Sequence, residues 1–573
     1  MMHKKIIDSI VESLNKATGE MLDSSDIKDS NISDYSSNVV FRLAGVEGVK
    51  PGDKAQEILG KLDADLIYGI VRVEALNGYI NFFLDYEMLT PTLLDVIRKR
   101  GESYGSGGGG GERVILEHTS INPSGPVHVG RLRNSLIGDS LARILRFHGF
   151  DVETHYYVND VGKQIAMISQ ASFEGVEPDG EACNRYRDYM SKKDFKVFAE
   201  YGSANRLFEE DDGFKTRVQD LIKRAESGDA EALEAMKKKA SDCLKGQLVL
   251  FSRLGISFDV FDYESDLIRD GCVREVVDFL GGVEYAREGD VGLGLDLSAF
   301  GIEKRGGVSV LLRGDGTSVY LARDVAYHLH KAGLGGGLVN VLGEDHKLEF
   351  REVATILGEI YGISRSLEAV HYSFVSFEGL ELSTRKGQTA PVDLLLDDAI
   401  NKAEHEITER GVASVDVAPL IGVGAVKYHI LKAAPSKPIS FSWDEALNFD
   451  GDSAPYIQYA HARCCSILEK SGLDLDDVVL EGVGDLDELE KRLVFMLLRF
   501  PDVVDKAAVG YKPNLVSSFV YELASVFSRF YRECPVLNEG DDVRLRRLLL
   551  VDAVRQVLCS GLFLLGIKAP RRM

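Results

Sequence analysis

Residues 113–158 hold a strand, a turn, a long helix and a second strand in direct succession. The strand RVILEHT leads through the turn NPSGP into VHVGRLRNSLIGDSLARILRFHG, whose apolar residues recur at helical spacing, and then into VETHYYV. A strand, a helix and a second strand in this order form a βαβ unit, which places the two strands in parallel. Further apolar strands expected at 338–342 and 370–375 extend the unit. The sequence therefore predicts an α/β domain built on a parallel sheet.

The chain before this unit is predicted to form a separate domain. The glycine-rich segment GESYGSGGGGG at 101–111 is typical of a flexible linker, which makes residues 1–100 an independent unit. Within it, residues 1–60 predict helices, and residues 67–85 predict two strands around the hairpin turn Asn77-Gly78. We therefore expect an N-terminal domain of the α+β type.

The chain after the linker divides into two further parts. Residues 112–435 are assigned to the α/β domain and residues 436–573 to a C-terminal domain. The charged, helix-prone stretch at about 165–260 interrupts the strand pattern, so it predicts a helical insertion. Strand signals fade after about 440, and amphipathic patterns there indicate an all-α bundle. These patterns lie at 455–470, 486–508, 514–531 and 543–565.

Composition excludes several classes of protein. The 573 residues carry a formal charge of −23, which argues against a general nucleic-acid coat, although the stretch from Arg544 to the end has a local net charge of +6. The seven cysteines include no CxxC pair and no histidine at zinc-ligand spacing, so neither a disulfide framework nor a protein-bound metal is predicted. The chain shows no signal peptide and no apolar run of about twenty residues, which predicts a cytoplasmic protein without a membrane span.

Two clusters of residues suggest phosphate chemistry. The turn before the long helix contains His128, Gly130 and Arg131, at the place where an open parallel sheet binds its ligand. A helix N-terminus offers unpaired N–H groups to phosphate, glycine permits a close approach, and cations counter developing charge. The alternative is a histidine that caps the helix and binds nothing. The second cluster, LSTRKGQ at 382–388, can follow a phosphate on a mobile loop, with a solvated charged turn as its alternative.

The order of these motifs resembles that of the arginyl-tRNA synthetase family of class I aminoacyl-tRNA synthetases. The resemblance rests on EHTSINPSGPVHVGRLRNS, YYVNDVGKQIA, DGTSVYLARDVAYHL, VLGEDHKLEF, LSTRKGQ, ALNFDGDSAPYIQYAHAR and GLFLLGIKAPRRM, and it covers nearly the whole chain. It implies a Rossmann-type catalytic domain with a helical insertion, an N-terminal additional domain and a C-terminal anticodon-binding bundle.

The resemblance places ATP at the two clusters, because HVGR matches the class I HIGH signature and LSTRKG matches the arginyl variant of the KMSKS loop. The ATP-binding residues implied are Pro126, His128, Gly130, Ser383, Thr384 and Lys386, and the catalytic residues implied are His128, Gly130, Arg131, Arg385 and Lys386. Arg131 replaces the second histidine of the first signature but keeps a cation beside the phosphates. Glu381 and Thr384 replace two lysines of the loop signature, so charge stabilisation is expected from Arg385 and Lys386.

The resemblance also implies a pocket for arginine. Its residues are Glu117, Ser120, Asn122, Tyr320, Asp324 and His346, the last where some relatives have glutamine. Carboxylates suit this substrate because a planar guanidinium presents paired donors that a carboxylate accepts bidentately. Tyr320 and Asp324 are four residues apart, so on a helix they share one face, and a surface Tyr–Asp contact is the alternative. Two buried carboxylates would discriminate against lysine, whose single ammonium leaves acceptors unpaired.

The tRNA contacts implied by the resemblance lie outside the catalytic domain. Tyr79 and Asn81 fall on the strand of the additional domain that contacts the D-loop corner of tRNA in the family. There an aromatic ring can stack on a base and an amide can read its edge, whereas a core tyrosine and a turn asparagine are the alternative. Tyr521 and the terminal Met573 match residues close to the anticodon in relatives.

The activity implied is the ATP-dependent charging of tRNA(Arg). The chain is expected to form arginyl-adenylate from L-arginine and ATP, with Mg²⁺ accompanying ATP, and to transfer arginine to the 3′ end of the tRNA. We expect a monomer. Two alternatives stay open: another class I synthetase, and a synthetase-like protein that binds tRNA without charging it. Arg131 and the altered loop signature keep the second alternative open.

Overall fold

A computed structural model describes residues 2–289, 292–304, 306–377, 390–411, 414–475, 478, 480 and 482–573. The cluster LSTRKGQ, with the predicted site residues Ser383, Thr384, Arg385 and Lys386, lies outside these ranges. No helix within them is long and apolar enough to cross a bilayer.

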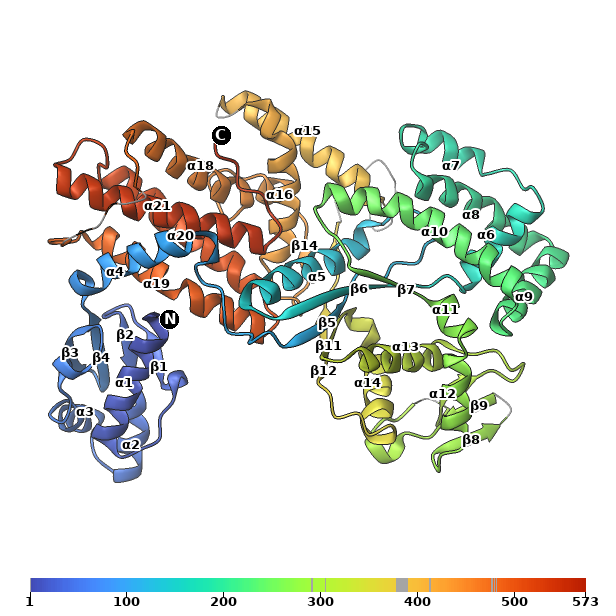
Figure 1. The fold of residues 1–573 in the computed structure, drawn as a ribbon, viewed down its shortest axis with the longest axis horizontal. Helices are drawn as coiled ribbons and strands as arrows, with labels where there is room; N and C mark the ends of the chain where they lie inside the picture. Colours follow the sequence, from blue (N-terminus) through green and yellow to red (C-terminus); the bar gives the residue numbers. More distant parts are fainter. Residues whose placement is uncertain are drawn as a thin grey trace.

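A five-stranded parallel sheet lies at the centre of the molecule (Figure 1). Its strands are β5 (Arg113–Glu117), β6 (Asp151–Val158), β7 (Val260–Tyr263), β11 (Gly337–Gly343) and β12 (Leu367–Tyr372). They follow the order β12-β11-β5-β6-β7, and every neighbouring pair is parallel. The order reverses direction at β5, so the crevice beside β5 is the topological switch point where such a sheet binds ligands. The predicted parallel sheet is confirmed.

Helix α5 (Val129–His148) connects β5 to β6 and ends at Gly149, as the sequence predicts. The φ angle of Gly149 is 108°, a left-handed conformation that favours glycine after a helix. The helix is buried along most of its length, because the sheet covers one side and C-terminal helices cover the other.

The predicted helical insertion is present between β6 and β7. It consists of α6 (Lys163–Phe173), α7 (Gly180–Arg185), α8 (Lys193–Glu210), α9 (Asp212–Glu226) and α10 (Ala230–Arg253). Asp179, Asp211 and Asp229 accept backbone N–H bonds at the starts of α7, α9 and α10, which explains how these helices begin in a highly charged stretch.

A second insertion, which the sequence pattern did not predict, lies between β7 and β11. It contains α11 (Glu264–Arg269), α12 (Cys272–Gly281) and an antiparallel sheet of β8 (Ala286–Gly289), β9 (Gly292–Leu295) and β10 (Ser309–Leu312). It ends in α13 (Tyr320–Leu334), and α14 (Lys347–Thr355) follows β11. A four-residue strand is too short to show a clear alternation of apolar and polar residues, so these strands were missed.

The N-terminal unit is α+β, as predicted, and it lies at one end of the molecule (Figure 1). Its helices are α1 (Met2–Thr18), α2 (Val39–Glu47) and α3 (Pro51–Leu59), and its antiparallel sheet contains β1 (Ile27–Asp29), β2 (Tyr35–Ser37), β4 (Tyr79–Leu84) and β3 (Ile70–Leu76) in that order. Asn77 and Gly78 have φ angles of 52° and 82°, which confirms the predicted hairpin turn. The three-residue strands β1 and β2 lie where only helices were predicted.

The glycine-rich segment at 101–111 packs closely against its neighbours and does not form the flexible linker that its composition predicted. Gly109 and Gly111 donate backbone hydrogen bonds of 2.9 Å to the carbonyls of His148 and Gly149. A Cβ atom at Gly108 would lie 2.6 Å from the His148 ring. The glycines therefore permit close contact with the end of α5.

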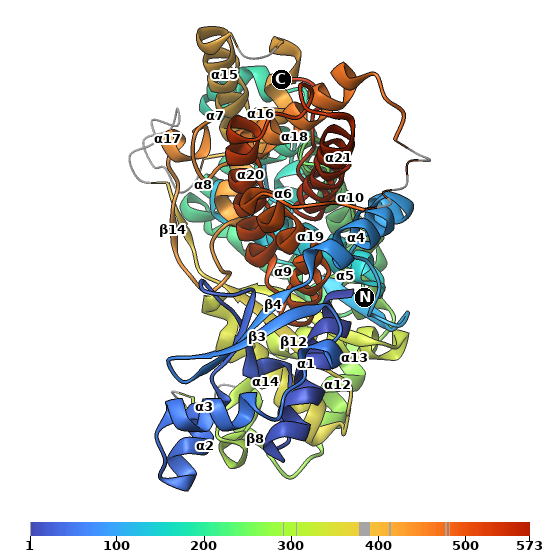
Figure 2. The same cartoon turned by 90° about the vertical axis from the view of Figure 1, so that its left-hand side faces the viewer.

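The C-terminal part of the chain is mainly helical, as predicted (Figure 2). After residue 436 its helices are α17 (Trp443–Ala446), α18 (Ala454–Ser471), α19 (Glu488–Val509), α20 (Pro513–Glu533) and α21 (Asp541–Leu564). Two further helices, α15 (Val392–Arg410) and α16 (Ala418–Leu431), lie before the predicted boundary at 435, and α16 packs against α18 and α20. Helix α4 (Tyr86–Arg100), which follows the N-terminal sheet, packs against α19 and α21. The short strands β13 (Val375–Ser376) and β14 (Ile439–Ser440) pair in parallel beside this region.

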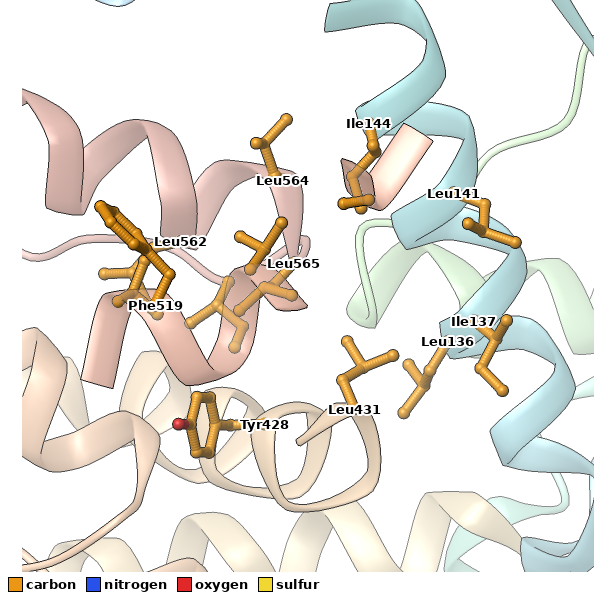
Figure 3. Packing of buried hydrophobic residues seen from close by; sticks show 14 of the residues in the cluster. Leu136, Ile137, Leu141, Ile144, Tyr428, Leu431, Phe519, Leu562, Leu564 and Leu565 are labelled. Carbon is orange, nitrogen blue, oxygen red and sulfur yellow. The ribbon is translucent and has the colours of Figure 1, made fainter. Parts of the chain in front are cut away.

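Helix α5 and the C-terminal helices share one apolar core (Figure 3). The labelled residues of this core are Leu136, Ile137, Leu141 and Ile144 of α5, Tyr428 and Leu431 of α16, Phe519 of α20, Leu562 and Leu564 of α21, and Leu565 just beyond it. In addition, the Ser140 hydroxyl donates a 2.8 Å hydrogen bond to the carbonyl of Leu564. Each fully buried Leu or Ile contributes about 1.5–3 kcal/mol, so the helix that begins at His128 is firmly held against the bundle.

Candidate active site

A cavity of about 1350 Å³ opens at the carboxyl ends of β5, β6 and β11. Most of the predicted pocket residues line it, namely Glu117, Ser120, Asn122, Pro126, His128, Arg131, Tyr320, Asp324 and His346. Gly130 is not among the lining residues. Pockets for single small ligands usually enclose 300–1,000 Å³, so this cavity has room for more than one substrate. The structure thus brings the predicted ATP and arginine residues together.

The turn that follows β5 is held in an unusual backbone conformation. Thr119 and Ser120 have φ angles of 74° and 42°, which non-glycine residues rarely adopt and which cluster at functional sites. Asn134 of α5 fixes the turn, because its Oδ1 accepts from the Thr119 N–H at 2.7 Å while its Nδ2 donates to the Val341 carbonyl at 2.9 Å. The turn, α5 and β11 are therefore tied together at the cavity floor.

His128 lies at the N-terminal end of α5, but its side chain does not cap the helix. Its Nδ1 atom is buried and has no hydrogen-bond partner within the described residues. Burial and the nearby Arg131 cation lower the pKa of His128, so the imidazole is neutral at pH 7. This arrangement does not support the capping alternative and leaves a histidine facing the cavity beside Arg131.

The segment that follows the LSTRKGQ cluster lies directly against this turn. The N–H of Val129 donates to the Ala390 carbonyl at 2.9 Å, and the N–H of Val392 donates to the Val127 carbonyl at 2.8 Å. Pro391 lines the cavity and forms an isolated bridge with His128. The turn with the HVGR motif and the start of α15 are therefore one packed unit.

Glu117 ends β5, as predicted, and its carboxylate is held on both sides. Its Oε2 accepts from Lys331 Nζ at 2.6 Å, and its Oε1 accepts from the Ser120 hydroxyl at 3.0 Å. Burial opposes the charged form, but the Lys331 charge and the hydrogen bonds from Lys331 and Ser120 outweigh it and hold the pKa of Glu117 below its usual range. Glu117 is therefore ionised and paired with the Lys331 ammonium.

Asp324 places a carboxylate in the cavity wall. It lies one turn after Tyr320 in the first turns of α13, so the predicted shared face is confirmed, and both side chains line the cavity. Its carboxylate has no hydrogen bond or ion pair among the described residues. Burial, with added repulsion from Glu117, Glu264 and Glu349, raises the pKa of Asp324 to about 8. A bound cation would reverse this shift.

Arg323 holds α13 in place and was not singled out from the sequence. Its guanidinium donates to Glu264 at 2.8 Å and to Glu226 at 2.7 Å, and all three side chains are largely buried. Glu226 ends α9 in the first insertion and Glu264 begins α11 in the second. The helix that carries Tyr320 and Asp324 is thereby joined to α9 of the first insertion and to α11 at the start of the second.

The first insertion supplies one wall of the cavity. Its lining residues are Gln164, Arg185, Tyr186, Phe198 and Tyr201, which lie on or next to α6, α7 and α8. Gln164 accepts from the Ser124 hydroxyl at 3.0 Å, which links the insertion to the turn after β5. Gln164 occurs in the motif YYVNDVGKQIA, yet nothing in that string indicated a residue facing the cavity.

The predicted tRNA contacts differ in exposure. On β4, the ring of Tyr79 is 41% exposed and packs edge-on against Phe41 with 5.0 Å between ring centroids. Asn81, on the same face of the strand, is only 3% exposed, and its Oδ1 accepts from the Ser33 hydroxyl at 3.2 Å. Tyr521 is partly buried beside Tyr456, and the terminal Met573 packs against the bundle core.

The basic C-terminal stretch is less available to RNA than its net charge predicted. Arg546 and Arg547 both pair with the buried Glu490, Arg555 pairs with Asp552, and Arg572 pairs with Glu469. Asp552 is already counted in the local charge of +6, and Glu490 and Glu469, which are distant in the sequence, offset a further part of it. Charge counted along a segment does not show how much of it faces solvent.

Sequence profiles of three families match the chain. These are the arginyl tRNA synthetase N-terminal domain over residues 4–84, the catalytic domain of class I (R) tRNA synthetases over 96–443, and the DALR anticodon binding domain over 457–573.

Curated proteins match over nearly their full length. The arginine–tRNA ligase of Methanocaldococcus jannaschii is 39% identical and aligns over 99% of each chain. That of Methanothermobacter thermautotrophicus is 41% identical over 95% of this chain and 93% of its own.

Solved structures show the same architecture. The arginyl-tRNA synthetase of Thermus thermophilus superimposes with a TM-score of 0.79 at 25% identity over the whole of both chains. That of Plasmodium falciparum gives 0.77 at 18% identity over 100% of this chain and 99% of its own, which supports the fold alone.

Parallel sheet, HVGR turn, helical insertion and C-terminal bundle together define a class I aminoacyl-tRNA synthetase. The full-length matches with curated proteins identify the family within that class. The chain belongs to the arginyl-tRNA synthetase family.

Proposed function

We propose that this chain is an arginine–tRNA ligase that charges tRNA(Arg) with L-arginine at the expense of ATP. One observation carries the proposal: the carboxylate of Asp324, which has no partner among the residues that the structure describes, lies in the same cavity as His128 and Arg131 at the start of α5. Asp324 can hold a cationic side chain, and His128 and Arg131 can face a nucleotide phosphate. Family membership supports the same assignment.

The reaction requires positioning and charge rather than a protein nucleophile. An oxygen of the arginine carboxylate attacks the α-phosphorus of ATP, the bond to the diphosphate breaks, and arginyl-adenylate forms. A ribose hydroxyl at the 3′ end of tRNA then attacks the arginyl carbonyl carbon, and AMP leaves. The cavity supports both steps by holding the reactants together beside groups that stabilise charge.

The groups at the start of α5 can stabilise the reacting phosphates. A neutral His128 imidazole can donate one hydrogen bond to a phosphate oxygen, and the N-terminus of α5 favours negative charge. The guanidinium of Arg131 supplies a cation that can counter charge on the phosphates. Mg²⁺ enters as part of the ATP substrate and offsets charge on the diphosphate, and the residues at 383–386 are proposed to assist in this charge stabilisation.

We assign the tRNA contacts to the two outer parts of the molecule. Tyr79 is the best-placed residue of the N-terminal sheet, because an exposed aromatic ring can stack on an unpaired base. Asn81 would read a base edge only after a movement that exposes its amide. Tyr521 and Met573 are proposed to lie near the anticodon.

The proposal is tested by arginine-dependent exchange between ATP and labelled diphosphate, with and without tRNA(Arg). We expect Asp324→Ala to raise the KM for arginine far more than the KM for ATP. Asp220→Ala, which removes an exposed carboxylate on α9, is the matched control and should change neither. A protein that binds tRNA but shows no arginine-dependent exchange in its presence would instead be the non-charging relative left open by the sequence.

A further inference from the structure

Lys331 lies two turns after Asp324 on α13 and is buried behind the arginine pocket. Its side chain is only 1% exposed, and it is not among the residues that line the cavity. Its ammonium donates to Glu117 Oε2 at 2.6 Å and to Asn340 Oδ1 at 2.8 Å, and it lies 4.2 Å from the centre of the Tyr327 ring. The substrate cannot reach this group directly, so any effect of Lys331 passes through its neighbours.

The first effect concerns the position of Glu117. Lys331 holds one carboxylate oxygen and Ser120 holds the other, so the carboxylate has a fixed orientation at the cavity wall. Each oxygen of a carboxylate has two acceptor sites, and the described contacts use only one on each. Glu117 is thus ionised and oriented, and it can still accept hydrogen bonds from a substrate.

The second effect concerns the helix that carries Asp324. Lys331 Nζ lies 3.5 Å from Nε2 of His328, and Nδ1 of the same ring lies 2.8 Å from the backbone carbonyl of Asp324. Burial, with the Lys331 charge, lowers the pKa of His328 to about 4, so the ring is neutral. A neutral ring that accepts from Lys331 must donate to the Asp324 carbonyl. Lys331 therefore connects the Glu117 carboxylate, through His328, to the backbone of Asp324.

The third effect concerns the charge of the pocket. Glu117 and Asp324 each carry one negative charge when ionised, and Lys331 carries one positive charge, which leaves a net charge of −1. One guanidinium restores neutrality. Without Lys331, Glu117 and Asp324 would line one pocket with no cation to offset them, and two such carboxylates do not both ionise readily.

We propose that Lys331 is a positioning residue for arginine recognition: it keeps Glu117 oriented and ionised, and it reduces the charge of the pocket to match a single guanidinium. This inference rests on the proposed function. A buried ion pair by itself is weak evidence for a role in stability, because apolar residues often pack as well at lower desolvation cost.

The test compares the kinetics of Lys331→Met and Lys331→Gln with wild type in arginine-dependent diphosphate exchange with tRNA present. We expect Lys331→Met to raise the KM for arginine roughly tenfold to a hundredfold, as for removal of the partner of a buried charge, with the KM for ATP within about twofold. Lys331→Gln is the milder change, because the amide can still donate to Glu117, and it should give an intermediate KM.

Two comparisons separate recognition from stability. Lys304 forms an ion pair of 2.7 Å with the buried Glu352, outside the cavity. Lys304→Met breaks this pair, so it should lower stability without changing the KM for arginine. The double variant Lys331→Met with Glu117→Gln should lose no more arginine affinity than the single variant that binds arginine more weakly. Both substitutions act on the same group, the carboxylate of Glu117.

The outcomes are distinguishable. A KM for arginine that stays within twofold of wild type in Lys331→Gln overturns the inference, even where Lys331→Met does not fold. Equal rises in the KM for arginine and for ATP also overturn it, because they indicate a merely structural role. If wild type shows no arginine-dependent exchange, the proposed function fails before the variants are compared.

Discussion

Arginine binding should depend steeply on pH between 6 and 8, because Asp324 must be ionised to receive the guanidinium. In the empty pocket, burial and neighbouring carboxylates raise the pKa of Asp324 to about 8. Below that pH the group is mostly protonated and neutral. A cation that binds only the ionised form must displace the proton, so affinity rises with pH and levels off above the pKa of the free pocket.

The magnitude follows from the fraction of ionised Asp324. With a pKa of about 8, roughly one pocket in a hundred is ionised at pH 6, one in ten at pH 7 and half at pH 8. The dissociation constant for arginine should therefore fall about 50-fold from pH 6 to pH 8, which corresponds to about 2.3 kcal/mol. At pH 7, binding should release about 0.9 proton per arginine.

Titration calorimetry measures both quantities. Arginine is titrated into the full chain at pH 6, 7 and 8 in buffers with different ionisation enthalpies, and the slope of the heat against that enthalpy gives the number of protons released. Asp324→Asn is the control, since it should bind arginine weakly and with no pH dependence over this range. A wild-type dissociation constant that is the same at pH 6 and pH 8, with no proton release, would refute the reasoning.

Three further perturbations test other parts of the structure. His128→Asn should lower the rate of diphosphate exchange by about a hundredfold with an unchanged KM for arginine, as for loss of one group that stabilises transition-state charge, and steady-state kinetics measure this. Gly566→Ala should lower the free energy of unfolding by roughly 1–3 kcal/mol, because Gly566 has a φ of 65° and a Cβ atom there would lie 2.6 Å from Asp139 Oδ2. Gly540→Ala is the control and should not lower it, because the space around Gly540 is open. Tyr521→Ala should raise the KM for tRNA roughly tenfold to a hundredfold if the ring stacks on an anticodon base, and it should leave the KM for arginine unchanged.

The parallel sheet and the bundle were predictable because their signals are local. The apolar spacing within residues 127–149 predicts α5 and its end at Gly149, and long amphipathic stretches predict α18 to α21. The short strands β1 and β2 and the second insertion gave no such signal, because three or four residues cannot establish a period. Composition misled at 101–111, where glycine permits close packing rather than flexibility.

The sequence predicted residues of the candidate site that line the cavity, but not those buried behind them. Motif order indicated Glu117, Asp324 and His128, and the cavity brings these together. Lys331 was missed because its partner Glu117 is 214 residues away and no local pattern joins them. The burial of Asn81 depends likewise on tertiary structure.

The central claim, that the chain attaches arginine to tRNA, is tested most directly by incubating the full chain with ATP, tRNA(Arg) and each labelled amino acid in turn. We predict acid-precipitable label on tRNA only when the labelled amino acid is arginine. Lysine should give none, because its single ammonium leaves acceptors of the pocket unpaired. Bound tRNA with no arginine attached, or charging with another amino acid in preference to arginine, would contradict the account.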